Sequence, residues 1–288
     1  MAKAKASAAI NILEFDTAKI AEREREVAKE SDQEIIERLR ERFDILRDMT
    51  VAVKKGDVRA MIVSGPPGVG KSFGVEEVLS KDDLFDTLGN RKPKYEIVKG
   101  AMSALGLYAK LYEYSDAKHV LVFDDCDSIL LDDLSLNILK GALDSGSKRT
   151  IAWNTDSRML RSEGIPDKFE FKGAAIFITN IKFEHVKSKR LRDHLDALES
   201  RCHYIDLQMD TTREKMLRIK QIVGDGMLDR YDFNEPELAK DEIIQFVEDN
   251  KDRLRELSLR MVLKIADLRK SFSSTWKSMA KTTCMRRA

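Results

Sequence analysis

Long hydrophobic runs are absent from this sequence, and cysteine is scarce. No apolar stretch approaches the roughly 18 residues that a membrane-spanning helix needs, so no membrane partner is expected. The three cysteines, Cys126, Cys202 and Cys284, cannot all pair, and their spacing matches no zinc site. Residues 1–15 lack the long apolar segment of a signal peptide. This pattern is typical of a reduced, soluble, cytoplasmic protein.

An excess of charge of one sign is also missing. The 51 Lys and Arg residues nearly balance the 50 Asp and Glu residues, so the chain of 288 residues has no general affinity for polyanions. Basic residues still gather at 181–192 and from Lys264 onward. These stretches either bind nucleic-acid phosphates or form solvated or protein-binding surface.

Residues 1–50 are highly charged and predict a helical arm. Ser31 and Glu34 have the spacing of a capping box. The apolar residues that follow recur at spacings of three and four, which places them on one helix face: Ile35, Ile36, Leu39, Phe43 and Leu46. Gly56-Asp57 is expected to end this helix. For residues 21–30 we expect a solvated helix or a loose arm.

Short apolar stretches alternate with helical ones between residues 51 and 208. Strands are expected at residues 58–65, 95–100, 119–125, 174–180 and 202–207. This alternation predicts an α/β fold with a parallel sheet between helices, and ligands bind such sheets at the carboxyl ends of strands. Residues 149–173 predict an inserted strand, a loop and a return strand. From residue 209 onward only helices are expected, at 211–223, 236–250 and 258–272, with starts at Glu235-Pro236 and Leu257-Ser258.

The stretch GPPGVGKS at residues 65–72 fits the pattern G-x-x-x-x-G-K-[ST], between an expected strand and an expected helix. Its glycines let backbone N–H groups turn towards phosphate oxygens, and the helix adds its positive N-terminal end. Lys71 is expected to reach the β- and γ-phosphates, and Ser72 to bind Mg²⁺, so ATP and Mg²⁺ are the expected cofactors. The expected cofactor-binding residues are Gly65, Pro66, Pro67, Gly68, Val69, Gly70, Lys71, Ser72 and Phe73.

Asp124 and Asp125 end a second apolar strand. Because both strand ends can meet at one phosphate, Asp124 is expected to hold the Mg²⁺ with Ser72. Asp125 is placed to orient or deprotonate an attacking water. Asp127 is expected to act as a simple N-cap of the next helix.

On these motifs the sequence resembles the AAA+ ATPase family over roughly residues 35–275. GPPGVGKS resembles its Walker A motif, and VLVFDD resembles its Walker B motif. The resemblance implies three further roles: Asn180 as the sensor 1 residue that helps to place the water, Arg201 as an arginine finger and Arg260 as the sensor 2 arginine. With Lys71 and Asp125 these residues form the expected catalytic set. The implied domains are a charged helical arm (1–50), an AAA+ nucleotide-binding domain (51–208) and a helical lid with a basic C-terminal tail (209–288).

In this family the finger points into a neighbouring subunit, where its planar cation stabilises charge on the γ-phosphate. The resemblance therefore implies a head-to-tail homo-oligomeric ring such as a hexamer. The family's Walker B motif ends in Asp-Glu, whereas this one ends in Asp124-Asp125. A misplacement of about 1 Å can cost on the order of a hundredfold in rate. Either the backbone compensates, or hydrolysis is slow, or the protein acts chiefly as an ATP-bound switch.

Two features point to different branches of the family. Ser200-Arg201-Cys202 resembles the Ser-Arg-Cys box of clamp-loader subunits, whereas residues 149–173 resemble the hairpin inserted before sensor 1 in ring helicases, unfoldases and related motors. The whole string also resembles AAA+ proteins of tailed bacteriophages. We expect an ATPase that remodels or translocates DNA or a protein client; the alternative is an ATP-gated loader or scaffold with slow hydrolysis. Residues 100–110 occupy the place of the pore-lining segment in this family, where Met102, Leu105, Leu107 and Tyr108 would grip a peptide or a nucleic-acid backbone. The alternative is that Leu105, Tyr108 and Leu111 form the buried face of a helix.

Overall fold

The structure, a computed structural model, describes residues 23–81, 93–183 and 186–286, and it divides into two compact units. The first unit comprises Arg42–Gly65 and Lys71–Leu207. The second comprises residues 23–41, Pro66–Gly70 and residues 208–286. Helix α2 (Asp32–Lys55) contributes residues to both units. Within the described residues, no helix is long and apolar enough to cross a membrane.

The first unit contains a five-stranded parallel sheet, which confirms the predicted α/β fold. The strand order is β2 (Tyr95–Lys99), β3 (Val120–Asp124), β6 (Ala174–Thr179), β1 (Ala60–Ser64) and β7 (His203–Asp206). These are the five strands that the sequence predicts. Every residue of β1, β3 and β6 is buried, as expected for strands covered on both faces. Since β6 lies between β1 and β3, the carboxyl ends of these three strands are neighbours.

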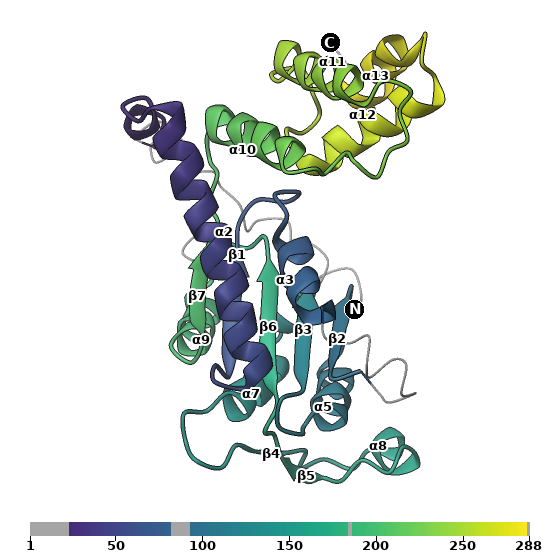
Figure 1. The fold of residues 1–288 in the computed structure, drawn as a ribbon. Coiled ribbons are helices and arrows are strands. Elements are labelled where there is room, and N and C mark those ends of the chain that lie inside the picture. The colour runs from purple at the N-terminus through teal and green to yellow at the C-terminus, as the bar shows by residue number, and fades with distance from the viewer. Residues whose placement is uncertain (1–22, 82–92, 184–185, 287–288) are drawn as a thin grey trace. The chain divides into compact units, whose positions relative to one another are not determined.

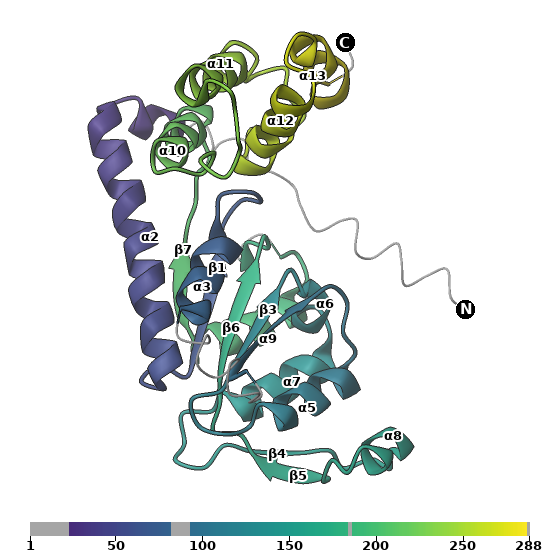
Figure 2. The ribbon, with the colours of Figure 1, turned by 45° about the vertical axis from the view of Figure 1, so that its right-hand side comes forward.

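Helices cover both faces of this sheet (Figures 1 and 2). On one face, α5 (Ala104–Glu113), α7 (Asp133–Ala142) and α9 (Lys189–Glu199) pack around Phe123 and Phe177, whose rings stack 5.3 Å apart. On the other face lie α3 (Lys71–Ser80) and residues 42–55 of α2. There Leu46 packs against Gly74, 3.4 Å from the place that a Cβ on this glycine would take.

Residues 104–113 form helix α5, whose inner face is buried as one of the two interpretations of this stretch expected. Tyr108 and Leu111 are fully buried, and Leu105 is half-buried. The Tyr108 ring lies 5.0 Å from that of Phe169, and its hydroxyl donates to the Pro166 carbonyl at 2.9 Å. Tyr108 is therefore a core residue that anchors the inserted hairpin on α5.

The inserted hairpin is confirmed, because β4 (Thr150–Ala152) pairs antiparallel with β5 (Lys168–Glu170). The predicted loop between them contains a short helix, α8 (Arg158–Ser162), which is a correction. Ser157 caps this helix by accepting from the backbone N–H of Leu160, and the side chain of Leu160 is fully buried. One buried leucine and one cap thus order a segment that is otherwise polar.

Helix α2 begins and ends as the sequence predicts. Its capping box is formed, since Ser31 N donates to Glu34 Oε2 at 2.7 Å and Glu34 N donates to Ser31 Oγ at 3.2 Å. The predicted apolar face is buried, with Ile36 half-buried. Gly56, with φ at +85°, follows the last residue of the helix, as glycine does at many helix C-termini.

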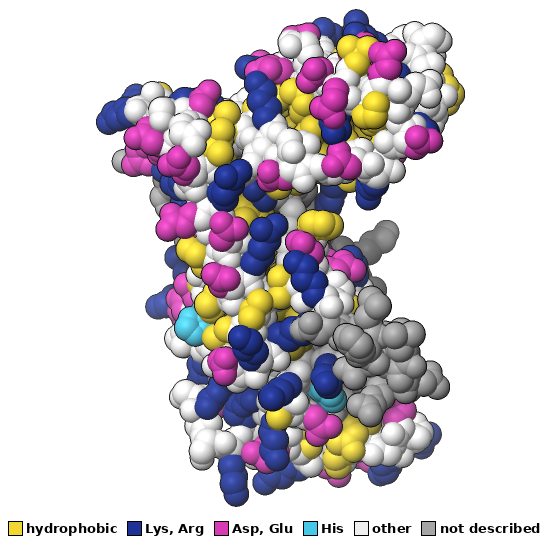
Figure 3. Space-filling model, viewed as in Figure 1, with side chains coloured by type: hydrophobic (Ala, Val, Ile, Leu, Met, Phe, Trp, Pro, Cys, Tyr) yellow, Lys and Arg dark blue, Asp and Glu magenta, His cyan; other side chains and the backbone are white. Residues whose placement is uncertain are grey.

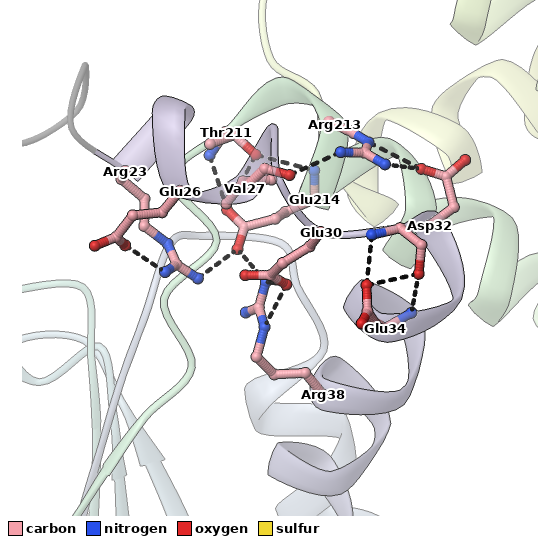
Figure 4. A network of polar contacts seen from close by, with 11 residues as sticks. Arg23, Glu26, Val27, Glu30, Asp32, Glu34, Arg38, Thr211, Arg213 and Glu214 are labelled. Carbon is pink, nitrogen blue, oxygen red and sulfur yellow. Dashed lines mark hydrogen bonds and ion pairs between the residues drawn. The ribbon is translucent and has the colours of Figure 1, made fainter.

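The expected solvated helix is confirmed for most of the described part of residues 21–30, since residues 23–27 are helical and most side chains of residues 23–30 are exposed, but two residues depart from it. Val27 is only 2% exposed, and Arg23 Nη2 donates to Glu214 Oε1 at 3.1 Å. Arg38 Nη2 donates to the same oxygen at 3.1 Å, while Glu214 Oε2 accepts from Thr211 N at 3.1 Å (Figure 4). Glu214 is fully buried. Arg23 of this segment and Arg38 of α2 therefore share a buried carboxylate within the second unit.

The C-terminal part of the second unit is all-helical. It contains α10 (Thr212–Gly224), α11 (Pro236–Asp249), α12 (Leu259–Ser271) and α13 (Trp276–Cys284). The predicted starts are confirmed, because Glu235 and Ser258 are the N-cap residues of α11 and α12. The predicted basic tail contains the helix α13, in which Trp276, Ala280 and Cys284 recur every four residues and are buried.

Candidate functional site

The predicted site residues of the first unit gather where β1, β3 and β6 end. Lys71 Nζ donates to the Gly65 carbonyl at 2.6 Å and to Asn180 Oδ1 at 2.8 Å. Asn180 Nδ2 in turn donates to Asp125 Oδ1 at 2.8 Å, and Ser72 Oγ donates to Asp124 Oδ1 at 2.8 Å. The structure therefore brings six predicted site residues together, Gly65 included, in two short chains of hydrogen bonds.

The loop before Lys71 has a backbone that requires glycine. The φ angles of Gly68 and Gly70 are +71° and +102°, in the left-handed region that other residues rarely adopt. Lys71 is the first residue of the ten-residue helix α3 and is 6% exposed. The first turn of α3 contains no acidic residue, so its own carboxylates do not offset the positive end of the helix dipole.

The two aspartates at the end of β3 have different surroundings. Asp124 is 5% exposed, and its Oδ2 lies 3.4 Å from Lys99 Nζ at the end of β2. Asp125 is exposed and has a φ of +53°, a conformation that aspartate tolerates better than most residues because its short side chain hydrogen-bonds locally. Lys99 was not predicted as a site residue, since an exposed lysine at the end of a strand belongs to no motif.

The prediction that Asp127 is a simple N-cap is wrong. Cys126 occupies the N-cap position of α6 (Asp127–Leu130), and Asp127 is its first helical residue. Asp127 Oδ1 accepts from Thr179 Oγ1 at 2.7 Å, and Thr179 Oγ1 accepts from Ile181 N at 3.0 Å. Burial raises the pKa of Asp127 despite this hydrogen bond. Asp127 and Thr179 thus brace the strand end next to Asn180, a role that sequence reasoning missed.

Arg201 lies at the other edge of the sheet. It follows α9 and precedes the parallel strand β7, so it is near the amino ends of the strands. At about 3.3 Å per residue, the four residues of β7 alone separate the two edges by about 13 Å. Arg201 Nη1 donates to the Ala197 carbonyl at the end of α9, and its buried Nε finds no hydrogen-bond partner among the described residues.

Arg260 belongs to the second unit, where it is the second residue of α12 and is exposed. Its Cγ lies 3.6 Å from the place that a Cβ on Gly68 would take. The start of α12 is thus in contact with the loop residues Pro66–Gly70 of the same unit.

The oxygen atoms at this site suit Mg²⁺ better than a metal ion whose ligands all come from the protein. The described residues contain no group of three or more His, Cys, Asp and Glu residues that could hold a metal ion. Ser72 and Asp124, joined at 2.8 Å, offer one hydroxyl and one carboxylate. Mg²⁺ is commonly bound by one or two protein oxygens together with water and phosphate oxygens, so these two residues fit it.

Local basic stretches are partly paired. In the predicted basic stretch 181–192, of which 184–185 lie outside the described residues, Arg190 forms an ion pair with Asp133 at 2.5 Å and Arg192 donates to the Val186 carbonyl. The face seen in Figure 3 shows Lys and Arg interspersed with Asp and Glu. Nucleic-acid binding by these stretches stays a prediction.

No protein-family model matches the chain. The chain is similar to a protein of Enterobacteria phage T4 that is described as an uncharacterised 36.7 kDa protein of the nrdC–mobD intergenic region. The two sequences are 32% identical over 271 residues, which cover 93% of this chain and 79% of the phage protein.

Proposed function

Because the chain belongs to the same family as this phage T4 protein, whose description states no activity, we propose its function from the site alone: a Mg²⁺-dependent ATPase of the AAA+ type. The observation that carries the proposal is the meeting of Lys71, Ser72, Asp124, Asp125 and Asn180 at one sheet edge. A lysine, a hydroxyl and two carboxylates beside a glycine loop and a helix N-terminus are the parts that phosphoryl transfer uses.

Each group has a role that its position supports. The N–H groups of the loop and Lys71 bind the phosphates, and Lys71 exchanges its present acceptors, the Gly65 carbonyl and Asn180 Oδ1, for phosphate oxygens. Ser72 and Asp124 hold Mg²⁺, which neutralises charge on the β- and γ-phosphates. Asn180 fixes the orientation of the Asp125 carboxylate, which takes the proton of the attacking water.

The place of Arg201 supports action on a neighbouring subunit. It lies near the amino edge of the sheet, whereas the polar network lies at the carboxyl edge, so it is far from the site of its own chain. A second copy docked head to tail would bring its Arg201 to this site. We therefore propose a head-to-tail ring that acts on DNA or on a protein client.

A slow, ATP-gated loader or scaffold is the second candidate. Asp125 is shorter than the glutamate of the family pattern, and its Oδ1 is bound by Asn180 at 2.8 Å. A base that is one methylene too short is displaced by about 1 Å, which lowers the rate of hydrolysis by on the order of a hundredfold. The two candidates share nucleotide binding and differ in turnover.

Titration with fluorescent ATP tests the shared step. Lys71→Ala is expected to weaken ATP binding by about a hundredfold or more, because it removes a buried cation from the loop. Lys172→Ala is the matched control, since Lys172 is 59% exposed on the hairpin, and we expect an affinity within about twofold of wild type. No binding by the wild type, or full binding by Lys71→Ala, would contradict the proposal.

A further inference from the structure

The phosphate loop is bound directly to the start of α12, within the second unit. Leu259 N donates to the Gly68 carbonyl at 2.8 Å. A Cβ on Gly68 would lie 2.7 Å from Ser258 Cβ and 3.0 Å from Ser258 Oγ. Since real Cβ atoms do not approach other atoms to 2.7 Å, only glycine fits at this contact.

Ser258 serves both sides of this contact. It is the N-cap of α12, 4% exposed, and its Oγ accepts from Met261 N at 3.2 Å. Its Cβ faces Gly68, and Arg260, two residues further along, packs its Cγ beside the same point at 3.6 Å. One short stretch of chain therefore holds the loop tip, the first turn of α12 and Arg260.

The contact also sets the direction of a loop N–H group. The peptide bond is planar and trans, so its carbonyl and N–H point in opposite directions. Because the Gly68 carbonyl points to α12, the N–H of Val69 points away from it. Proline fixes φ at positions 66 and 67, whereas glycine has the greatest freedom. The bond from Leu259 thus orders the part of the loop that is otherwise least constrained.

We propose that Ser258 is a positioning residue that sets the phosphate-binding shape of the loop and the place of Arg260 together. This inference rests on the proposed nucleotide binding, and it makes the helical part of the second unit a component of the binding loop. Steric overlap at the contact between Ser258 and Gly68 then displaces the loop and weakens nucleotide binding.

A double-mutant cycle tests this coupling. Gly68→Ala is expected to weaken ATP binding about a hundredfold, through overlap with Ser258 and through the left-handed φ of +71°. Ser258→Gly alone is expected to cost only about two- to threefold, because glycine is a nearly adequate N-cap. The double variant loses the overlap and keeps the φ strain, so we expect its affinity to recover to within about tenfold of wild type.

Ser157→Gly is the matched control, because Ser157 is the N-cap of α8 and Leu160 N donates to it at 3.4 Å. Combined with Gly68→Ala it should show additive losses. A residue that merely caps a helix would not rescue Gly68→Ala, so rescue separates positioning from capping.

Thermal unfolding without nucleotide gives an independent readout, in which the double variant should unfold at a higher temperature than Gly68→Ala. If the wild type binds no ATP, the proposed function fails, and the unfolding series still tests the contact. If affinities and unfolding temperatures are both additive for the Gly68 and Ser258 changes, the positioning role is overturned.

Discussion

Replacing Glu214 with glutamine is expected to destabilise the second unit by about 3 kcal/mol. Glu214 is fully buried, and its two oxygens accept four hydrogen bonds, from Arg23, Arg38, and the N and Oγ1 of Thr211 (Figure 4). Glutamine has nearly the same shape but no charge and one acceptor oxygen. The two arginines would lose their shared counter-ion, and an amide N–H₂ would face other donors.

The size of this loss of stability depends on the two arginines, which stay in place when Glu214 is replaced. Removing one member of a buried ion pair typically costs about 3–5 kcal/mol, because the other charge stays buried. The lower end applies here, since the side chains of Arg23 and Arg38 are 27% and 23% exposed. They also keep Glu26 and Glu30 as partners, at 3.0 Å and 2.8 Å.

Urea unfolding followed by tryptophan fluorescence measures this change. The chain has two tryptophans, so in a Trp153→Phe background only Trp276 reports, and it is 3% exposed in the second unit. Glu34→Gln is the matched control, because it removes the glutamate of the exposed capping box of α2. Its expected cost is below about 0.5 kcal/mol.

The effect should also depend on pH. Burial alone would raise the pKa of Glu214, but the hydrogen bond from Thr211 and the charges of Arg23 and Arg38 hold the pKa below its usual 4.5. A carboxyl whose pKa falls on folding stabilises the protein at every pH above its unfolded-state pKa. This contribution is lost as the pH falls through the lowered pKa of the folded state. The difference between wild type and Glu214→Gln should thus be full at pH 7 and shrink below pH 4.5. A loss under about 1 kcal/mol at pH 7, or one that acid leaves unchanged, would refute this reasoning.

Three further predictions concern the first unit. Arg201→Ala is expected to bind ATP within about twofold of wild type and to lose about a thousandfold in turnover. Mixing it with Lys71→Ala should restore turnover, because the intact Arg201 of one variant then meets the intact nucleotide site of the other. An inactive mixture would argue against head-to-tail assembly. Asp125→Asn keeps an oxygen acceptor for Asn180 and a residue suited to a φ of +53°. Single-turnover assays should therefore show normal ATP binding, with hydrolysis slowed by about 10²- to 10⁴-fold. Unchanged hydrolysis would show that Asp125 is not the base. In the wild type, Arg149 donates to the carbonyls of Ala142 and Gly173 at 3.2 Å and 3.0 Å. Arg149→Met leaves both carbonyls without this buried donor and should lower the free energy of unfolding in urea by about 2–3 kcal/mol. A decrease below about 0.5 kcal/mol would contradict this.

Local patterns predicted the sheet because short apolar runs ended by Gly65, Asp124 and Asn180 leave few alternatives to buried strands. The start of α2 was predictable for a similar reason, since Ser31 and Glu34 need only each other. The motifs also placed Lys71 and Asp125 at one edge, because parallel strands share the direction of their carboxyl ends.

The features that the sequence did not predict depend on distant residues. Arg23 belongs to a charged stretch, and its burial depends on Glu214, 191 residues later. Asp127 has the pattern of a cap, but Thr179 binds its carboxylate. Helix α13 lies in a basic stretch, and its burial requires Trp276 to pack on Phe246, with ring centroids 5.2 Å apart. None of these partners is adjacent in the sequence, so no local pattern reports them.

The measurement that tests the central claim most directly is the rate of ATP hydrolysis per subunit with Mg²⁺, over a wide range of protein concentrations. The rate per subunit is predicted to rise with concentration, because Arg201 of one copy completes the site of the next, and Lys71→Ala is predicted to show no hydrolysis at any concentration. Hydrolysis at a rate that is independent of concentration would contradict action between subunits. Absence of hydrolysis at every concentration would contradict the ATPase itself.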